Sequence, residues 1–205
     1  MNVIIIHLER SKSRLPIIEL IKSKFDNIKI IDGIDGQNMN DNEFNNYNNK
    51  LITYWNTSND MRRGKIGCYL SHIKTLEYIV ENKLNNVLVL EDDMKPNFNE
   101  FPNIEIEDNI YMYYLSGFYW NNKLIGLTSI IYPKWQYTKE ILDILKKRFI
   151  SGKFKAIDIE ICNQIHTKFN IKLHNEKLFI HSDNFSYIHN KPIKNYKNGK
   201  YKVIY

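Results

Sequence analysis

The chain has 205 residues, of which 43% are hydrophobic, and this predicts one domain with its own core. An excess of 29 Lys and Arg over 23 Asp and Glu gives a net charge of +6. This charge favours anionic partners, but it does not choose among nucleotide phosphates, acidic glycans, membrane surfaces and nucleic acid. The two cysteines lack C-x-x-C spacing, so they suggest neither a disulfide framework nor a structural zinc site.

Neither a leader nor a transmembrane segment is expected. The strand-like run at 3–6 is followed by charge rather than by a small-residue cleavage site, which predicts no signal peptide. No apolar stretch approaches the roughly 20 residues that a bilayer crossing needs. We predict a cytoplasmic protein in a reducing compartment, with at most peripheral membrane contact.

The opening residues predict a β-α-β unit. The apolar run at 2–8 is typical of a buried parallel strand, and a helix is expected from 11 or 13 to 25. A second strand at 28–31 ends at Asp32-Gly33, and Asp35-Gly36 repeats the turn signal. Parallel strands joined by helices imply an α/β fold with a mostly parallel central sheet flanked by helices.

The middle of the chain predicts a helix and then a strand that ends in three carboxylates. Residues 37–60 are polar and predict a loop with one or two short helices. Apolar residues recur at helical spacing over 66–80, and a strand follows at 87–90. This strand delivers Glu91-Asp92-Asp93 at its carboxyl end, where ligands bind in open α/β sheets.

The remaining segments complete a single domain over 1–205. Periodicity and turn residues predict, in order, strands at 110–115 and 125–132, helices at 138–149 and 157–169, and a short strand at 178–180. Residues 190–205 form a basic tail, which we interpret as solvated rather than as a binding patch.

Three consecutive carboxylates at the end of a buried strand repel one another and resist desolvation, so a divalent cation would stabilise them. Mg²⁺ and Mn²⁺ take oxygen ligands from carboxylates and complete their shell with diphosphate oxygens and water. The alternative is a solvated acidic turn with no ligand.

Several blocks of the sequence resemble the family 25 glycosyltransferases, which include bacterial lipooligosaccharide galactosyltransferases and collagen galactosyltransferases. Residues 64–72 (GKIGCYLSH) and 87–93 (VLVLEDD) look like that family's G-x-I-G-C-x-L-S-H and L-V-L-E-D-D motifs. Residues 4–14 are similar to its I-N-L-x-R-x-x-x-R start, with His7 in place of the usual Asn. Asp32-Gly33 resembles its D-G turn, and 156–158 resembles a P-V-D element.

The resemblance implies a GT-A type nucleotide-sugar-binding fold and a metal-dependent hexosyltransferase. The expected donor is a UDP-sugar, carrying galactose or glucose, and the expected cofactor is Mn²⁺ or Mg²⁺. The acceptor would be a glycan or a glycosylated protein, as in lipopolysaccharide biosynthesis, and transfer would proceed with inversion at the anomeric carbon.

Nucleotide-binding residues are expected where the first two strands end. Arg10 and Arg14 lie at the junction of the first strand and helix, so both are candidates for the diphosphate, with Arg10 the stronger and Arg14 more readily a surface arginine. Asp32 is a candidate for the ribose or uracil, although an Asp-Gly turn needs no such role. Glu91 and Asp92 complete the expected donor site.

Metal ligands and a base are expected from both halves of the chain. Asp93, Glu91 and His181 are the proposed metal ligands, since GT-A enzymes often recruit a late histidine. Inversion needs a carboxylate beyond the metal site, and Asp158 is the candidate base, unless it is only a helix N-cap. The fallback bases are Glu160 and Asp183, and His189 is a further late histidine.

Two motif-bearing clusters have structural alternatives. Arg62, Arg63 and Lys65 could neutralise a departing diphosphate, or could lie in a solvated loop. Cys68, Ser71 and His72 are interpreted as packing and hydrogen-bonding groups rather than as catalysts.

Two other functions remain open at this point. A silent nucleotide-sugar or glycan-binding domain would keep the fold without turnover. A nucleic-acid-binding protein would explain the positive charge, but no zinc finger, RNP motif or basic helix supports it, and we expect no nucleic-acid partner.

Overall fold

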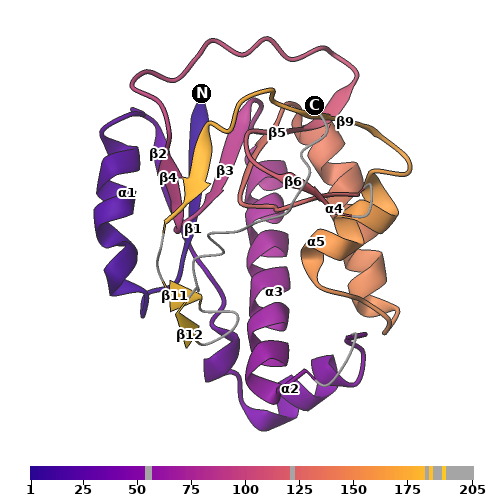
Figure 1. The fold of residues 1–205 in the computed structure, drawn as a ribbon. Helices are drawn as coiled ribbons and strands as arrows, with labels where there is room; N and C mark the ends of the chain where they lie inside the picture. The colour runs from indigo at the N-terminus through magenta and orange to yellow at the C-terminus, as the bar shows by residue number, and fades with distance from the viewer. Residues whose placement is uncertain (54–56, 121–122, 183–184, 187–190, 193–205) are drawn as a thin grey trace.

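The computed structural model describes residues 1–53, 57–120, 123–182, 185–186 and 191–192, so most of the expected basic tail lies outside it. Its centre is a six-stranded sheet in the order β2-β1-β3-β8-β5-β9 (Figure 1). The strands are β1 (Asn2–His7), β2 (Ile28–Asp32), β3 (Val87–Glu91), β5 (Ile110–Tyr114), β8 (Ser129–Tyr132) and β9 (Asn170–Leu173).

The sheet is mostly parallel, as the sequence predicted. Strand β1 pairs in parallel with both β2 and β3, and β5 pairs in parallel with β9. Strand β8 runs antiparallel to both of its neighbours, β3 and β5. The carboxyl ends of β1, β2 and β3 therefore meet at one edge of the sheet.

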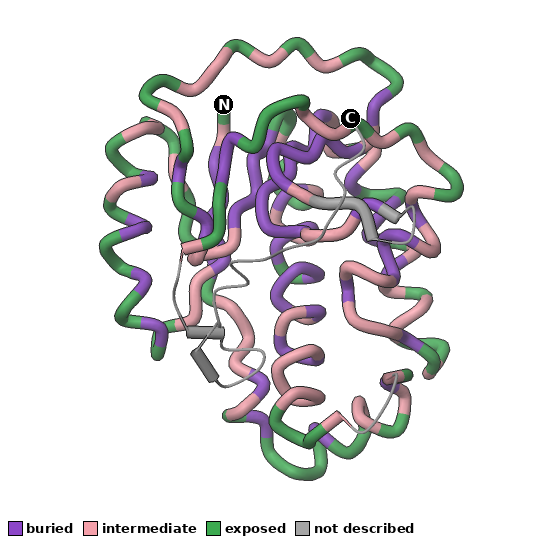
Figure 2. Tube along the Cα trace, in the orientation of Figure 1, coloured by how far each residue is buried: buried purple, intermediate pink, exposed green. Residues whose placement is uncertain are grey.

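The central strands are buried on both faces, as Figure 2 shows in purple. Because side chains alternate along a strand, Val3 and Ile5 pack with Leu88 and Leu90 on the face covered by α1 (Leu15–Lys22). The residues between them pack on the opposite face, against α3 (Asn59–Glu81) and α4 (Trp135–Ile150).

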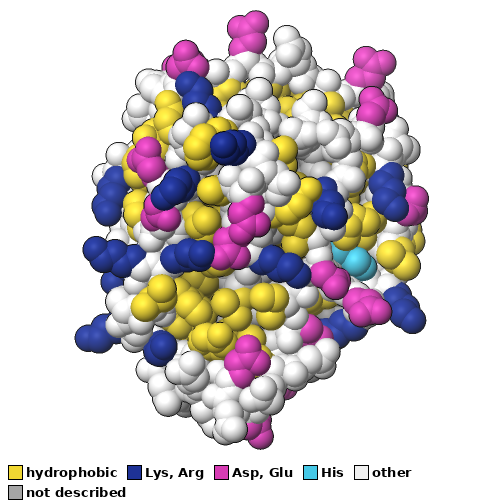
Figure 3. Space-filling model, turned by 180° about the vertical axis from the view of Figure 1, so that it is seen from behind, with side chains coloured by type: hydrophobic (Ala, Val, Ile, Leu, Met, Phe, Trp, Pro, Cys, Tyr) yellow, Lys and Arg dark blue, Asp and Glu magenta, His cyan; other side chains and the backbone are white. Residues whose placement is uncertain are grey.

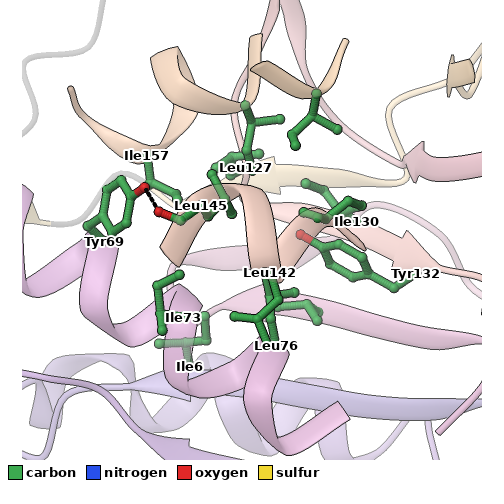
Figure 4. Close-up of a cluster of buried hydrophobic side chains, with 14 of the residues drawn as sticks. Ile6, Tyr69, Ile73, Leu76, Leu127, Ile130, Tyr132, Leu142, Leu145 and Ile157 are labelled. Carbon is green, nitrogen blue, oxygen red and sulfur yellow. Dashed lines mark hydrogen bonds between the residues drawn. The ribbon is translucent and has the colours of Figure 1, made fainter. Parts of the chain in front are cut away.

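The core beneath α3 and α4 is continuous. Figure 4 shows Ile6 of the sheet among Ile73 and Leu76 of α3 and Leu142 of α4. The Tyr69 hydroxyl donates to the Leu145 carbonyl at 3.0 Å, so the one polar atom of that ring is satisfied. This packing fixes α3 firmly against the sheet.

Shorter elements connect the layers. They are η1 (Lys12–Arg14), η2 (Gly36–Asn38), α2 (Asp41–Asn48), β4 (Met94–Pro96), β6 (Phe118–Trp120), β7 (Lys123–Ile125), α5 (Ile157–Glu160), the π-helix η3 (Ile161–Ile165), β10 (Phe179–His181), β11 (Phe185–Ser186) and β12 (Lys191–Pro192). Strand β10 pairs antiparallel with β4, so that His181 lies opposite Met94.

Several predicted boundaries were wrong. The helix predicted at 66–80 begins at Asn59, because Ser58 caps it by accepting a hydrogen bond from the Met61 amide. The strand predicted at 125–132 is two strands, separated at Gly126, whose φ is +100°. The helix predicted at 157–169 is one α-helical turn followed by η3.

Candidate functional site

A cleft opens at the carboxyl ends of β1 and β3. Its walls come from the segment after β1, the loop after β2, the first half of α3 and the end of β3. The cleft is lined by Arg10, Arg14, Glu91, Asp92 and Asp93, five of the residues that the sequence assigned to the donor site. The topology therefore brings these residues together.

The end of β3 divides the three carboxylates, since Glu91 is the last residue of the strand and Asp92 and Asp93 lie in the turn that follows. Glu91 has the same parity as Val87 and Val89, so its side chain lies on the α3 face. Asp92 has the parity of Leu88 and Leu90, which pack on the α1 face. Each carboxylate therefore has its own partners.

Glu91 pairs with α3. Its Oε1 lies 3.1 Å from His72 Nε2. Burial alone would raise the pKa of Glu91, but the hydrogen bond from His72 and the charges of His72, His181 and Arg14 outweigh it and hold that pKa below its usual value. Cys68 lies one turn before His72, and burial raises the pKa of its thiol, as do the charges of Glu91 and Asp158.

Asp92 pairs with β1. Its Oδ2 lies 2.7 Å from His7 Nδ1, at the position where the resembling family carries Asn. Burial raises the pKa of Asp92 by more than the His7 hydrogen bond and nearby positive charges lower it. The sequence analysis gave this histidine no role, because only the parallel register of β1 and β3 makes the two residues neighbours.

Asp93 meets groups from the two ends of the chain. Its Oδ2 lies 3.4 Å from Arg14 Nη1 and 3.5 Å from His181 Nδ1. Its Oδ1 is buried and has no hydrogen-bond partner among the described residues. The Ser182 amide donates to the Asp93 carbonyl at 2.9 Å, and the Ser182 hydroxyl accepts from Arg14 at 3.2 Å.

His181, the histidine expected near the metal, does reach Asp93. Its strand β10 pairs with β4, which begins immediately after Asp93. Burial lowers the pKa of His181, which favours the neutral imidazole that binds metals. Arg14 is 2% exposed, so its interpretation as a surface arginine was wrong. Glu91 does not join this group, since His72 holds it on the other side.

Arg10 forms an ion pair with Asp35, its Nε lying 2.5 Å from the carboxylate. The Asp35 loop is held tightly against α3, where a Cβ added to Gly67 would lie 2.5 Å from the Ile34 carbonyl oxygen. Asp32, the predicted nucleotide ligand, is exposed and lines a neighbouring shallow hollow rather than the cleft. The sequence predicted only a turn role for Asp35, which lies in the loop after β2.

Asp158 lies in the first turn of α5, which packs against α3. Ala156 is the N-cap of that helix, so the N-cap interpretation of Asp158 was wrong. Burial raises the pKa of Asp158, and the charge of Glu91 raises it further, while the Ile159 amide and Lys65 lower it. Asp158 therefore interacts electrostatically with the α3 side of the cleft.

The fallback bases differ from Asp158. Glu160 is 1% exposed and accepts hydrogen bonds from the Lys155 amide at 2.8 Å and Arg148 Nε at 3.3 Å, so it holds the fold. Asp183 and His189 lie outside the described residues.

The predicted basic loop is the first part of α3. Arg62 donates to the Asn48 side chain at 3.0 Å, and Arg63 donates to the Met39 carbonyl at 2.6 Å and pairs with Asp41. These two arginines anchor the segment that contains α2 and are not a solvated loop. Burial lowers the pKa of Lys65, which faces Asp158 instead.

The model of glycosyltransferase family 25, described as an LPS biosynthesis protein family, matches residues 1–198. The chain belongs to this family. It is 27% identical over 98 residues to "Procollagen galactosyltransferase 2" of Mus musculus and equally to that of Homo sapiens. Each alignment covers 46% of this chain and 16% of the relative, so the chain matches a small part of those longer proteins.

Two solved structures share low similarity with this family 25 chain. One is a glycosyltransferase involved in glycosylation of the major capsid of PBCV-1, with a TM-score of 0.49 and 11% identity over 88% of this chain and 92% of that one. The other is the CTP:phosphocholine cytidylyltransferase of Streptococcus pneumoniae, with a TM-score of 0.42 and 13% identity over 88% and 92%.

The donor set around Asp93 fits a divalent cation in this family 25 chain. Asp93 Oδ1, which is buried and has no partner among the described residues, offers a hard oxygen ligand beside the imidazole of His181. The guanidinium of Arg14, 3.4 Å from Asp93 Oδ2, offsets part of the negative charge of that carboxylate.

No helix in the described part of the chain has the combined length and apolarity of a bilayer-spanning segment.

Proposed function

We propose that this chain transfers a hexose from a UDP-sugar to a glycan or protein acceptor, with a divalent cation and with inversion, in a GT-A type fold. Membership of family 25 supports glycosyl transfer, and the similarity to procollagen galactosyltransferases favours galactose over glucose. The buried, unpartnered Asp93 Oδ1 at the carboxyl end of β3 is the observation that carries the proposal.

The diphosphate would lie on the α1 side of the cleft. Arg10 and Arg14 both line the cleft, and a guanidinium forms strong charge-assisted bonds with phosphate oxygens. Asp93 and His181 would hold Mn²⁺ or Mg²⁺ there. A bound cation of this kind would neutralise the charge that develops on the departing UDP.

The acceptor would approach from the α3 side. Asp158 is the proposed base, because its carboxylate is half-buried and, among the described residues, forms no ion pair like that of Glu160. Its raised pKa makes it a better proton acceptor than an ordinary aspartate, provided that it is ionised at the working pH. Inversion would require Asp158 and the cation site to act on opposite faces of the sugar.

The test is a panel of UDP-sugars with and without Mn²⁺, followed by hydrolysis of the donor and by thermal stabilisation of the protein. We expect one or two hexose donors to stabilise the protein and to be hydrolysed slowly, both only with the cation. Stabilisation without hydrolysis or transfer would favour a silent binding domain. No response to any donor would contradict the proposal.

Nucleic-acid binding is not favoured. On the face drawn in Figure 3, Lys and Arg are interspersed with Asp and Glu, and hydrophobic side chains gather between them. A protein that tracks a phosphate backbone places its basic residues in a patch or stripe.

A further inference from the structure

A thiol, an imidazole and a carboxylate converge on the α3 wall of the cleft. Cys68 and His72 are four residues apart on α3, so they lie on the same face of the helix. Glu91 approaches them from the end of β3. One ligand atom from each of these residues lies within 4.8 Å of the other two, and this is the one such group among the described residues.

We propose that Cys68, His72 and Glu91 form a zinc site whose fourth position opens into the cleft. Thiolate and imidazole are ligands that zinc prefers, whereas Mg²⁺ and Mn²⁺ favour oxygen ligands. Three protein ligands and one open position are typical of zinc sites that bind water or a substrate group. A single cysteine on a helix gives no C-x-x-C signal, which is why composition did not suggest the site.

The separations are close to those that the ion requires. Zinc bonds of about 2.0–2.3 Å at tetrahedral angles place the ligand atoms roughly 3.3–3.6 Å apart. The separation of His72 Nε2 and Glu91 Oε1 is 3.1 Å, and Cys68 Sγ lies within 4.8 Å of a ligand atom of each. Binding therefore requires the Cys68 thiolate to move closer to the other two ligands by about 1 Å.

The ion has a path to the site. Cys68 is half-buried and lines the cleft together with His72 and Glu91. The side chain of His72 is 3% exposed, so the ligands are shielded from bulk water except on the cleft side.

This site is separate from the one around Asp93. Glu91 Oε1 faces His72, whereas Asp93 Oδ2 faces Arg14 and His181. The two sites would take different ions, Mn²⁺ or Mg²⁺ at Asp93 and zinc at Cys68. The inference does not depend on transferase activity, because metal binding is measured without turnover.

The experiment is a titration of the tag-free, metal-stripped protein with Co²⁺, a spectroscopic substitute for zinc. A thiolate bound to Co²⁺ gives a near-ultraviolet charge-transfer band, and a tetrahedral ion gives intense visible bands. We expect both in the wild type and in Cys162→Ser, the matched control that removes the only other cysteine. Cys68→Ser should lose the charge-transfer band, and Zn²⁺ should abolish it in the wild type by displacing Co²⁺.

The affinity provides a second readout. Losing a hydrogen-bonding partner of a ligand weakens metal sites by roughly 10- to 100-fold, so loss of a ligand in Cys68→Ser or His72→Ala should weaken Co²⁺ binding at least that much. Asp93→Asn should keep the band, because Asp93 belongs to the other site. A wild type without the band, or a band that persists in Cys68→Ser, would overturn the proposal.

A measurement on the wild-type protein tests the site even if the Cys68 and His72 variants fail to fold. Zn²⁺ should slow alkylation of Cys68 by iodoacetamide, read by mass spectrometry peptide by peptide. Alkylation of Cys162 after unfolding serves as the internal reference for labelling. Equal labelling of Cys68 with and without Zn²⁺ would also overturn the site.

Discussion

The two sides of the β3 carboxyl end differ in what they offer a ligand. On the α3 side, Glu91 is hydrogen-bonded to His72 on a helix that is packed firmly into the core. On the α1 side, Asp93 has one satisfied and one unpartnered oxygen, and its neighbours come from η1 and from β10. Three adjacent carboxylates thus meet different partners, because β3 ends at Glu91 and the chain turns at Asp92 and Asp93.

The largest effect is expected from Asp93→Asn. If the α1 side holds the cation, this change should abolish transfer while leaving the fold intact, since Asn is nearly the same size but is a much weaker cation ligand. Turnover of the variant checks the loss of transfer, and its circular dichroism spectrum checks that the fold is intact. Asp143→Asn, an exposed residue paired only with Lys139, is the matched control and should behave as wild type. Full activity of Asp93→Asn would end the assignment.

The next largest effect is expected on the α3 side, from Asp158→Asn. Transfer should fall by roughly 10² to 10⁴, the usual contribution of a positioned base, whereas the affinity for UDP and the cation should not change. The transfer rate is measured with saturating donor and acceptor, and UDP affinity is measured by calorimetry. Together these measurements separate an effect on catalysis from an effect on binding. A variant with wild-type rates would show that the α3 side does not supply the base.

A smaller effect on binding is expected from Arg10→Ala. The dissociation constant for UDP should rise by one order of magnitude or more, because a charge-assisted contact contributes about 1.5–3 kcal/mol. Lys22→Ala removes an exposed positive charge from α1 and is the control for net charge. If calorimetry gives both variants the affinity of the wild type, the diphosphate does not lie on the α1 side at Arg10.

The smallest effect concerns stability rather than the cleft. Burial lowers the pKa of His166, beside the Tyr114 hydroxyl, from 6.5 to about 4. The unfolded chain therefore binds a proton at His166 before the folded protein does, so stability is full above pH 6.5 and falls as the pH drops towards about 4. In His166→Gln, the melting temperature should depend less on pH over this range. If the melting temperature of the variant falls with pH as steeply as that of the wild type, the acid sensitivity does not come from His166.

Much of the first half of the fold could be predicted from the sequence. The buried runs of β1 and β3 and the turn after β2 have local signals, and they fix where Arg10 and Glu91-Asp92-Asp93 lie. Strands β4 and β9 were missed, because short strands at the edge of a domain carry little periodicity.

The partners of the site residues could not be predicted in the same way. His7 meets Asp92 only through strand register, and His181 meets Asp93 only because β10 pairs with β4. Asp158 was found through a thin resemblance at 156–158, not through any local signal. Contacts between residues far apart in the chain depend on packing, which no local pattern records.

The most direct test of the account is calorimetry of UDP binding to the wild type with Mn²⁺, to the wild type in excess EDTA, and to Asp93→Asn with Mn²⁺. The account predicts binding in the first case and a large loss of affinity in the other two, because Asp93 holds the cation that the diphosphate needs. Equal UDP affinity in all three would contradict it.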